Sequence, residues 1–312
     1  MKHRVAFAFV LAAGVVAGVD IACGGGDAST TPAEEQDTGA LDATGAIDDA
    51  ADATDAADAG LTCQPSDVLT PQRPLEVLFV TKETLFHHYD AHDAGDVAVP
   101  AYLRARGHHV TVSADSSYFD GDKLMPFDVV MFFVTSGNVV SEPSQQDALV
   151  RFVHAGKGVV GTHTATATDN DWLFMYGLMG ATFGGHGSGD AQFTPGRMRI
   201  VDTANPLTSF LPDPWERTDE WYFYDRNPVL NPNLRFLLLL DETSVEPYRP
   251  LYPDAGFYGD AGHPLAWTQD YECSRVFYTS LGHTGESYSE EPLLHSLAAG
   301  VEWAGAPSSA RP

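Results

Sequence analysis

The chain has 312 residues, with 43 acidic and 17 basic side chains and a formal net charge of −26 at pH 7. From Val68 onward it still carries 31 acidic against 15 basic residues. Binding to nucleic acid by phosphate neutralisation needs clustered Lys and Arg, so this balance excludes that class and we expect no nucleic-acid partner.

Residues 1–22 have the layout of a secretory signal peptide, with a basic start and an apolar run from Val5 to Val19. The run is shorter than the roughly 20 residues of a membrane-spanning helix. Cys23 follows a small residue, which indicates a bacterial lipoprotein with lipid on Cys23. Asp20 is atypical of lipoprotein signals, so the alternatives are cleavage by ordinary signal peptidase and an uncleaved anchor. We predict an exported, cell-envelope lipoprotein, periplasmic or on the cell surface, that meets the membrane only through this lipid anchor.

Residues 23–73 are expected to form a disordered tether. Between residues 24 and 67 there are 11 acidic residues, no Lys or Arg, and no aromatic side chain. Such a segment cannot bury enough apolar surface to offset the entropy lost on ordering. A folded domain over residues 74–306 and a short tail, 307–312, complete the predicted organisation.

Two further cysteines, Cys63 and Cys273, remain once Cys23 is assigned to lipid. In an oxidising compartment an even pair favours a disulfide, and two free thiols are the alternative. The bond would close a loop of about 210 residues and requires the two Cα atoms to lie roughly 4.4–6.8 Å apart.

The domain alternates strand-like and helix-like segments. Short apolar runs predict buried strands, and periodic segments that end at glycine predict helices. The expected strands are 76–82, 109–114, 127–137, 158–162, 235–240, 264–267 and 275–279, and the expected helices are 97–106, 144–155 and 293–303. The last two strands are expected to be joined by a hairpin at 269–274. Strands alternating with helices predict an α/β domain with a mostly parallel sheet covered on both faces.

Histidines follow several of these strands. Binding sites of parallel sheets collect at the carboxyl ends of the strands, which would place His88, His163, His186 and His283 on one rim. Histidine can act as base, acid or metal ligand near neutral pH. The alternative for each is a loop histidine held by a structural hydrogen bond.

An acidic pair, Asp219 and Glu220, stands among aromatic residues that include Trp221. Paired carboxylates can divide acid and base roles or bind a cation, and aromatic rings can stack on a sugar. A salt-bridged turn beside core aromatics is the alternative. The chain has no Gly-x-Ser-x-Gly elbow and no cysteine between Cys63 and Cys273, so it cannot be a cysteine-dependent amidotransferase at the turn after residue 162.

Several motifs resemble the ThuA-like family, which is named for a trehalose-utilisation protein. They are DWLFMYGLMGATFGGH, RTDEWYFYDRNP, HPLAWTQDYECSRVFYTSLGHTGESY and GVEWAGA. The resemblance spans residues 75–306 and implies a three-layer, flavodoxin-like domain of the class I glutamine amidotransferase-like superfamily without the amidotransferase cysteine. His163 falls in the family's Gly-x-His segment. The other matching positions are Trp172, His186, Asp219, Glu220, Trp221, His263 and His283.

Two departures from the family pattern stand out. Cys273-Ser274-Arg275 replaces a Gly-Gly-Arg, which fits the recruitment of a disulfide. His186-Gly187 replaces a His-Pro, which affects the shape of the loop at His186.

The resemblance and the aromatic–acidic loop together predict a carbohydrate-active enzyme that acts on a keto-disaccharide or related glycoside. His163 or His186 would be the general base, Asp219 or Glu220 would orient or protonate, and His283 would stabilise developing charge. Substrate-binding residues would be His88, Trp172, Trp221 and His263. The alternatives are a non-catalytic sugar- or glycan-binding module and a metal-dependent hydrolase on the same rim. No cofactor is specified, but the histidines with Asp219 would suit a divalent metal such as zinc.

Overall fold

The computed structural model describes residues 63, 68–245, 258 and 262–306. The predicted signal peptide, Cys23, most of the tether and the tail at 307–312 lie outside the described residues. Within the described residues, none of the helices combines the length and the apolar character needed to cross a membrane.

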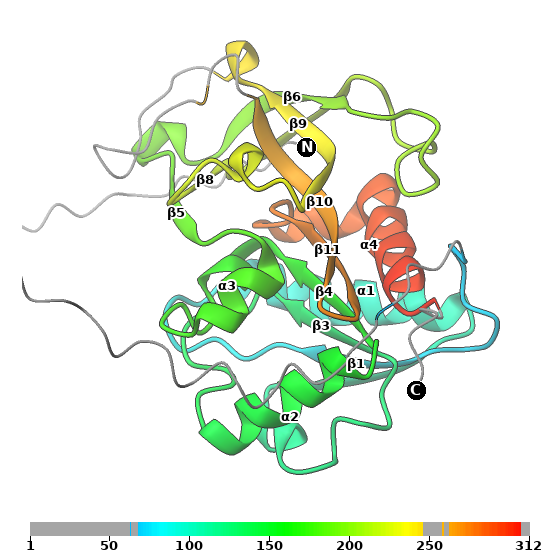
Figure 1. Ribbon diagram of the computed structural model, residues 1–312. Coiled ribbons are helices and arrows are strands. Elements are labelled where there is room, and N and C mark those ends of the chain that lie inside the picture. The colour runs from blue at the N-terminus through cyan, green and yellow to red at the C-terminus, as the bar shows by residue number, and fades with distance from the viewer. Residues whose placement is uncertain (1–62, 64–67, 246–257, 259–261, 307–312) are drawn as a thin grey trace, which may run out of the picture. The chain divides into compact units, whose positions relative to one another are not determined.

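The domain is built on a nine-stranded sheet in the order β2-β1-β3-β4-β11-β10-β9-β6-β7 (Figure 1). Its first five strands are mutually parallel: β2 His109–Ser113, β1 Glu76–Val80, β3 Val129–Phe133, β4 Gly158–Thr162 and β11 Ser274–Thr279. The remaining four are antiparallel to their neighbours: β10 His263–Tyr271, β9 Arg235–Asp241, β6 Thr194–Ile200 and β7 Trp215–Asp219. A small separate sheet pairs β5 Phe183–His186 with β8 Tyr222–Tyr224.

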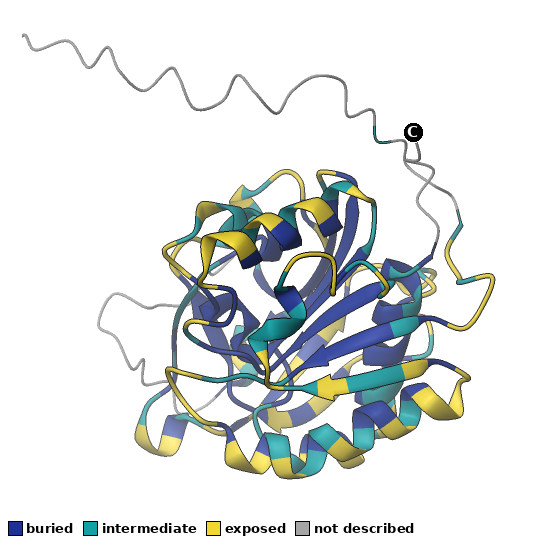
Figure 2. Cartoon of the chain, turned by 90° about the horizontal axis from the view of Figure 1, so that it is seen from below, coloured by how far each residue is buried: buried dark blue, intermediate teal, exposed yellow. Residues whose placement is uncertain are grey.

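The sheet is covered on both faces, because side chains alternate along each buried strand. Val77 and Phe79 of β1 point to one face, where they pack with α1 Tyr89–Ala105 and α4 Glu291–Ala304. Leu78 and Val80 point to the other, with α2 Pro143–His154 and α3 Leu173–Met179 (Figure 1). Figure 2 shows the helices turning exposed residues outward while the central strands stay buried. The α/β three-layer prediction is confirmed.

The largest differences from prediction lie in two places. Helix α1 starts eight residues before the predicted 97, because its first turns bury only small residues, Ala91 and Gly95, which leave no apolar periodicity. A Cβ on Gly95 would collide with Phe133, so the helix packs close to the sheet there. Strands β6 and β7 were not predicted, since Pro195 and Gly196 interrupt β6 and both are unfavourable in strand interiors.

The predicted disulfide between Cys63 and Cys273 is confirmed, with the Cα atoms 5.1 Å apart. Cys273 lies in the two-residue turn of the β10–β11 hairpin, where Tyr271 pairs with Ser274. The bond therefore links a residue that precedes the first strand to the centre of the sheet.

Glu302 lies at the end of the sheet opposite the histidines, and its charged contacts make the stability of the domain depend on pH. Glu302 accepts two hydrogen bonds from Arg106, at 2.7 and 2.8 Å, and lies 3.1 Å from His108. Burial raises the pKa of Glu302, but hydrogen bonds from His108 and Arg106 outweigh this effect and lower the pKa to about 2. A depressed carboxyl pKa contributes stability above the unfolded value of 4.5, and that stability is lost as the pH falls toward 2. We expect Glu302→Gln to remove about 1–2 kcal/mol of this contribution, discounted for partial exposure.

The measurement is the free energy of unfolding of the wild type and Glu302→Gln at pH 6, 4 and 3. The difference in free energy of unfolding between the wild type and Glu302→Gln should become smaller as the pH falls. For the control Glu216→Gln, at an exposed position on β7, the difference from the wild type should not change with pH. A gap that stays constant from pH 6 to pH 3 would contradict the assignment.

Candidate functional site

Three of the predicted histidines lie close together at the carboxyl ends of three parallel strands. His88 follows β1, His163 follows β4 directly, and His283 follows β11. The ring centroid of His163 lies 5.0 Å from that of His88 and 4.9 Å from that of His283. Because β4 and β11 are neighbours in the sheet, their end loops must meet, and the structure brings these residues together as expected.

His163 stands on a sharp turn from strand to helix. Its φ is +49°, in the left-handed region that costs a non-glycine residue on the order of 1–2 kcal/mol. Its ring is fully buried, and Nδ1 lies 2.7 Å from the Ser280 carbonyl oxygen, which can only accept a hydrogen bond. Nδ1 therefore carries the proton and Nε2 carries a lone pair. Tyr222 contacts that lone pair at 2.8 Å.

Tyr222 acts as the donor in this contact. Burial raises the pKa of Tyr222 well above its usual range, so the hydroxyl stays protonated and donates to His163 Nε2. The phenol thus neither competes as a base nor carries charge in the site.

Glu220 lies between the histidines. Its Oε2 is 2.8 Å from His283 Nδ1 and 3.4 Å from His163 Nε2. Its Oε1 accepts a hydrogen bond from Gln192 at 2.7 Å and lies 3.2 Å from His186 Nδ1. Burial raises the pKa of Glu220, but the hydrogen bond from His283 holds it well below its usual range, and His163, whose Nε2 carries a lone pair, does not donate to it. The carboxylate is therefore ionised although the residue is only 1% exposed.

His88 is oriented by a carboxylate that the sequence analysis did not single out. Glu83 Oε1 lies 2.5 Å from His88 Nδ1, and the same side chain accepts from the His88 backbone N–H at 2.8 Å. Burial lowers the pKa of His88 to about 4. The neutral ring donates its Nδ1 proton to Glu83, which leaves the lone pair on Nε2.

Glu83 itself is held as an anion. Burial raises the pKa of Glu83, but hydrogen bonds from His88 and His92 outweigh this effect and lower the pKa to about 2. His92 Nε2 lies 3.2 Å from Glu83, and its Nδ1 lies 3.0 Å from Asp96. Burial lowers the pKa of His92, but hydrogen bonds to Asp96 and Glu83 outweigh this effect and raise the pKa to about 9. A charged histidine–carboxylate pair therefore backs His88.

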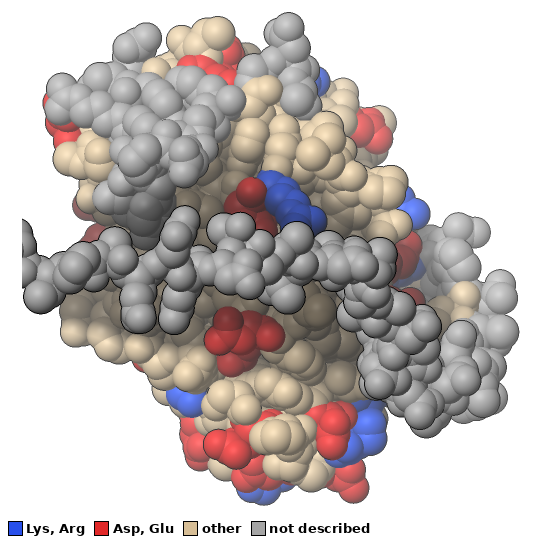
Figure 3. All heavy atoms as spheres, turned by 60° about the vertical axis from the view of Figure 1, so that its left-hand side comes forward, with Lys and Arg blue, Asp and Glu red and all other residues tan. Residues whose placement is uncertain are grey.

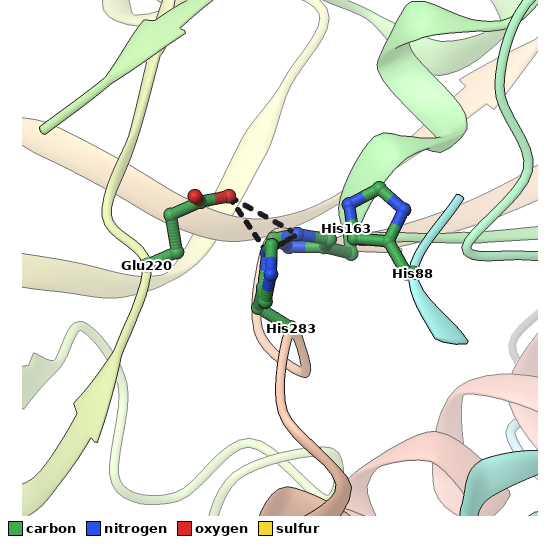
Figure 4. A group of neighbouring side chains, drawn as sticks. All are labelled: His88, His163, Glu220 and His283. Atoms are coloured by element: carbon green, nitrogen blue, oxygen red, sulfur yellow. Dashed lines mark hydrogen bonds and ion pairs between the residues drawn. The ribbon is translucent and has the colours of Figure 1, made fainter. Parts of the chain in front are cut away.

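Figure 4 shows the resulting group of His88, His163, Glu220 and His283, which we call the histidine–glutamate cluster. One nitrogen or oxygen atom of each residue lies within 4.8 Å of the others. Three of the four residues are buried and His283 is partly exposed. Imidazole nitrogen and carboxylate oxygen are ligands for zinc and related ions, so these residues could hold a metal ion.

Asp219 lies behind the cluster rather than in it. The side chain accepts hydrogen bonds from the backbone N–H groups of Gly282 at 2.9 Å, His283 at 3.2 Å and Glu220 at 2.9 Å. It also lies 3.2 Å from Arg217, whose side chain is 2% exposed. Asp219 thus positions the backbone that carries His283 and Glu220.

The cluster reaches the surface at His283, whose side chain is 13% exposed, and we call this side of the cluster, with His186 and two exposed rings, the entrance. His186 Nδ1 donates to the Gly187 carbonyl oxygen at 2.7 Å, so its Nε2 carries a lone pair. Phe86 is 54% exposed and Phe193 is 41% exposed. Phe193 contacts the ring of His283 at 4.8 Å and Phe86 contacts the ring of His88 at 4.7 Å, by centroid distance. Apolar walls above polar groups are the usual arrangement of a small-molecule site.

Three predicted substrate-binding residues lie elsewhere. Trp221 is 3% exposed and donates to Thr194 at 3.0 Å, so its ring is part of the core. Trp172 stacks on Phe174 beside α3. His263 is fully buried, with Nε2 2.7 Å from the Tyr222 carbonyl oxygen and Nδ1 2.9 Å from Glu242. These contacts suit structural roles.

Sequence reasoning missed Glu83, Tyr222 and Gln192. Glu83 had a usable signal, because it follows the first strand at the rim where sites collect. Tyr222 belongs to the aromatic–acidic run that was noted for its tryptophan. Gln192 stands in a segment without any chemical signature.

A family model described as "ThuA: Trehalose utilisation" matches residues 76–304. Among solved structures, the chain is similar to a ThuA-like protein from Bacteroides uniformis, with 19% identity and a TM-score of 0.62 over 76% of this chain and 94% of that one. It is also similar to a ThuA-like protein from Parabacteroides merdae, with 20% identity and a TM-score of 0.56 over 75% and 90%. At these identities the likeness shows the fold. No curated protein matches the chain.

Proposed function

The chain belongs to the ThuA family, whose description is trehalose utilisation, and from that premise we propose that its domain is an enzyme that acts on a keto-disaccharide or related glycoside. One observation carries the proposal. A buried group of histidines and an ionised carboxylate lies next to two exposed phenylalanine rings, with Phe86 in contact with His88 and Phe193 in contact with His283. Aromatic rings offer the apolar face of a sugar a stacking surface close to these polar groups.

His186 is the better placed of the two predicted bases. Its Nδ1 proton is held by the Gly187 carbonyl oxygen and Glu220, so Nε2 is ready to accept a proton. Its side chain is 18% exposed, whereas that of His163 is fully buried and its lone pair is filled by Tyr222. A base must reach the substrate, so we assign this role to His186 and the orienting role to Glu220.

The proposed reaction uses the acidity of a carbon next to a carbonyl. His186 takes the proton from the carbon between the keto group and the glycosidic carbon, and the C–H electron pair forms an enolate. Those electrons then form a carbon–carbon double bond as the glycosidic C–O bond breaks, and the leaving oxygen takes the proton back from His186. The products are an unsaturated keto sugar and a free sugar; addition of water to the former would complete a hydrolysis.

The test is a turnover assay of the purified chain with oxidised and unoxidised disaccharides. We expect His186→Ala to lower kcat by about 10²–10⁴-fold, the usual contribution of a general base. Phe193→Ala should chiefly raise KM, and His154→Ala on α2 is the matched control. Saturable sugar binding with no product from any of these disaccharides would reject the enzyme and favour a non-catalytic binding module.

Export is part of the proposal. The disulfide between Cys63 and Cys273 supports an oxidising compartment, since such bonds are rare in reducing ones. An acidic tether after a lipidated Cys23 would display the domain at the cell envelope. Loss of membrane association in Cys23→Ser, measured by cell fractionation, would be expected; unchanged association would contradict the lipid anchor.

A further inference from the structure

We propose that His88, His163, His283 and Glu220 bind one divalent transition-metal cation of the zinc class. The cation would sit at the centre of the histidine–glutamate cluster, between the sheet and the entrance formed by Phe86 and Phe193. This site deepens the proposed function, because it concerns the same cluster, but metal binding can be measured without any sugar.

The spacing of the donor atoms is the first argument. Zinc–nitrogen and zinc–oxygen bonds of about 2.0–2.1 Å place the ligands of a tetrahedral ion about 3.3 Å apart. His163 Nε2, His283 Nδ1 and Glu220 Oε2 are separated by 3.0, 2.8 and 3.4 Å, so they form one face of such a tetrahedron. His88 completes the group, with all four donor atoms within 4.8 Å of one another.

The direction of the lone pairs is the second argument. The Nδ1 atom of His163 is bound to the Ser280 carbonyl oxygen, and the Nδ1 atom of His88 is bound to Glu83. Each ring therefore turns an unprotonated Nε2 toward the cluster (Figure 4). A carboxylate or carbonyl behind a ligating histidine is the usual outer partner at metal sites. Tyr222 donates to His163 Nε2, and His283 Nδ1 donates to Glu220. A cation would take the place of both protons, and His283 would then carry its proton on Nε2.

Glu220 supplies the anionic ligand in a suitable geometry. Gln192 and His186 hold its Oε1, so Oε2 is the oxygen that faces His163 and His283. Imidazole binds a cation in its neutral form, so three such ligands with one carboxylate carry a net charge of −1, which a divalent cation compensates within a buried site. Nitrogen-rich ligand sets favour zinc and neighbouring ions, whereas Mg²⁺ and Ca²⁺ require mostly oxygen ligands.

The experiment is a titration of the full chain, stripped with a chelator, with Zn²⁺ followed by calorimetry and by metal analysis after gel filtration. We expect one Zn²⁺ per chain with a Kd below about 1 μM, and no measurable Mg²⁺ binding. His283→Ala and Glu220→Gln should each weaken Zn²⁺ binding by about 100-fold or more. Glu83→Gln should weaken it by about 10–100-fold through His88.

Controls keep the outcomes distinct. His109→Ala removes an exposed histidine beside Glu76 and should bind Zn²⁺ as the wild type does. Because His283 is the least buried ligand, its alanine variant should fold, which circular dichroism checks. Full Zn²⁺ stoichiometry and affinity in both His283→Ala and Glu220→Gln would overturn the site, as would wild-type binding weaker than about 0.1 mM. Turnover without Zn²⁺ binding would reject the metal site and keep the proposed enzyme, whereas Zn²⁺ binding without turnover would keep the metal site and reject the enzyme.

Discussion

Replacing Asp219 by asparagine should destabilise the domain by about 3–5 kcal/mol and abolish turnover, although Asp219 does not face the entrance. Its carboxylate is completely buried and compensates Arg217, whose side chain is 2% exposed. Removing one partner of a buried ion pair leaves an uncompensated charge, which accounts for the size of the effect. For a domain of this size the midpoint of thermal unfolding should fall by roughly 6–20 °C.

The same substitution should loosen the reaction centre. Asp219 receives backbone hydrogen bonds from Gly282, His283 and Glu220, and an asparagine amide cannot accept all three in the same geometry. Thermal unfolding and turnover of Asp219→Asn would be compared with Asp225→Asn, an exposed aspartate six residues later. A midpoint within about 1 °C of the wild type would mean that Glu290, 3.5 Å from Arg217, already balances its charge.

The second large effect concerns the disulfide. Reducing a bond that closes 210 residues should lower the free energy of unfolding by about 5 kcal/mol, because the reduced unfolded chain regains the entropy of that loop. We expect the Cys63→Ser, Cys273→Ser double variant to unfold at a correspondingly lower urea concentration. Its free energy of unfolding should also fall more steeply with urea, because the unfolded chain without the bond is more expanded and exposes more surface.

Two comparisons check this prediction. Cys23→Ser keeps the bond and should unfold as the wild type does. Addition of a reductant should shift the wild type to the position of the double variant and leave the double variant unchanged. Identical midpoints for wild type and double variant without reductant would show that the bond adds nothing to stability.

The sequence predicted the parallel half of the sheet well, because its strands are nearly pure apolar runs, such as Val129–Phe133. It also predicted the meeting of His88, His163 and His283, since the carboxyl ends of parallel strands share one edge. The antiparallel half was harder. Strand β6 alternates buried and exposed residues, but Pro195 and Gly196 suggest a loop, and only pairing with β7 and β9 makes it a strand.

The predicted sugar-stacking residues show the limit of sequence reasoning at the site. Trp221 looked suitable by type, yet Gly196 leaves space into which its ring packs, and the ring becomes core. Phe86 and Phe193 carried no motif, and their exposure depends on loops whose course no local pattern specifies. In the same way, Asp219 and Glu220 are neighbours in sequence, yet Glu220 contacts the histidines of the cluster and Asp219 contacts backbone N–H groups behind it.

The position of β11 has a consequence for the order in which the protein acquires its structure. This strand comes near the end of the chain, yet it lies in the middle of the sheet, between β4 and β10. Until it is inserted, the parallel and antiparallel halves share no strand, and His283 is missing from the cluster. During synthesis, the two halves can therefore join and the site can form only after the segment from Ser274 to His283 has been made, as expected for a fold that depends on contacts distant in sequence.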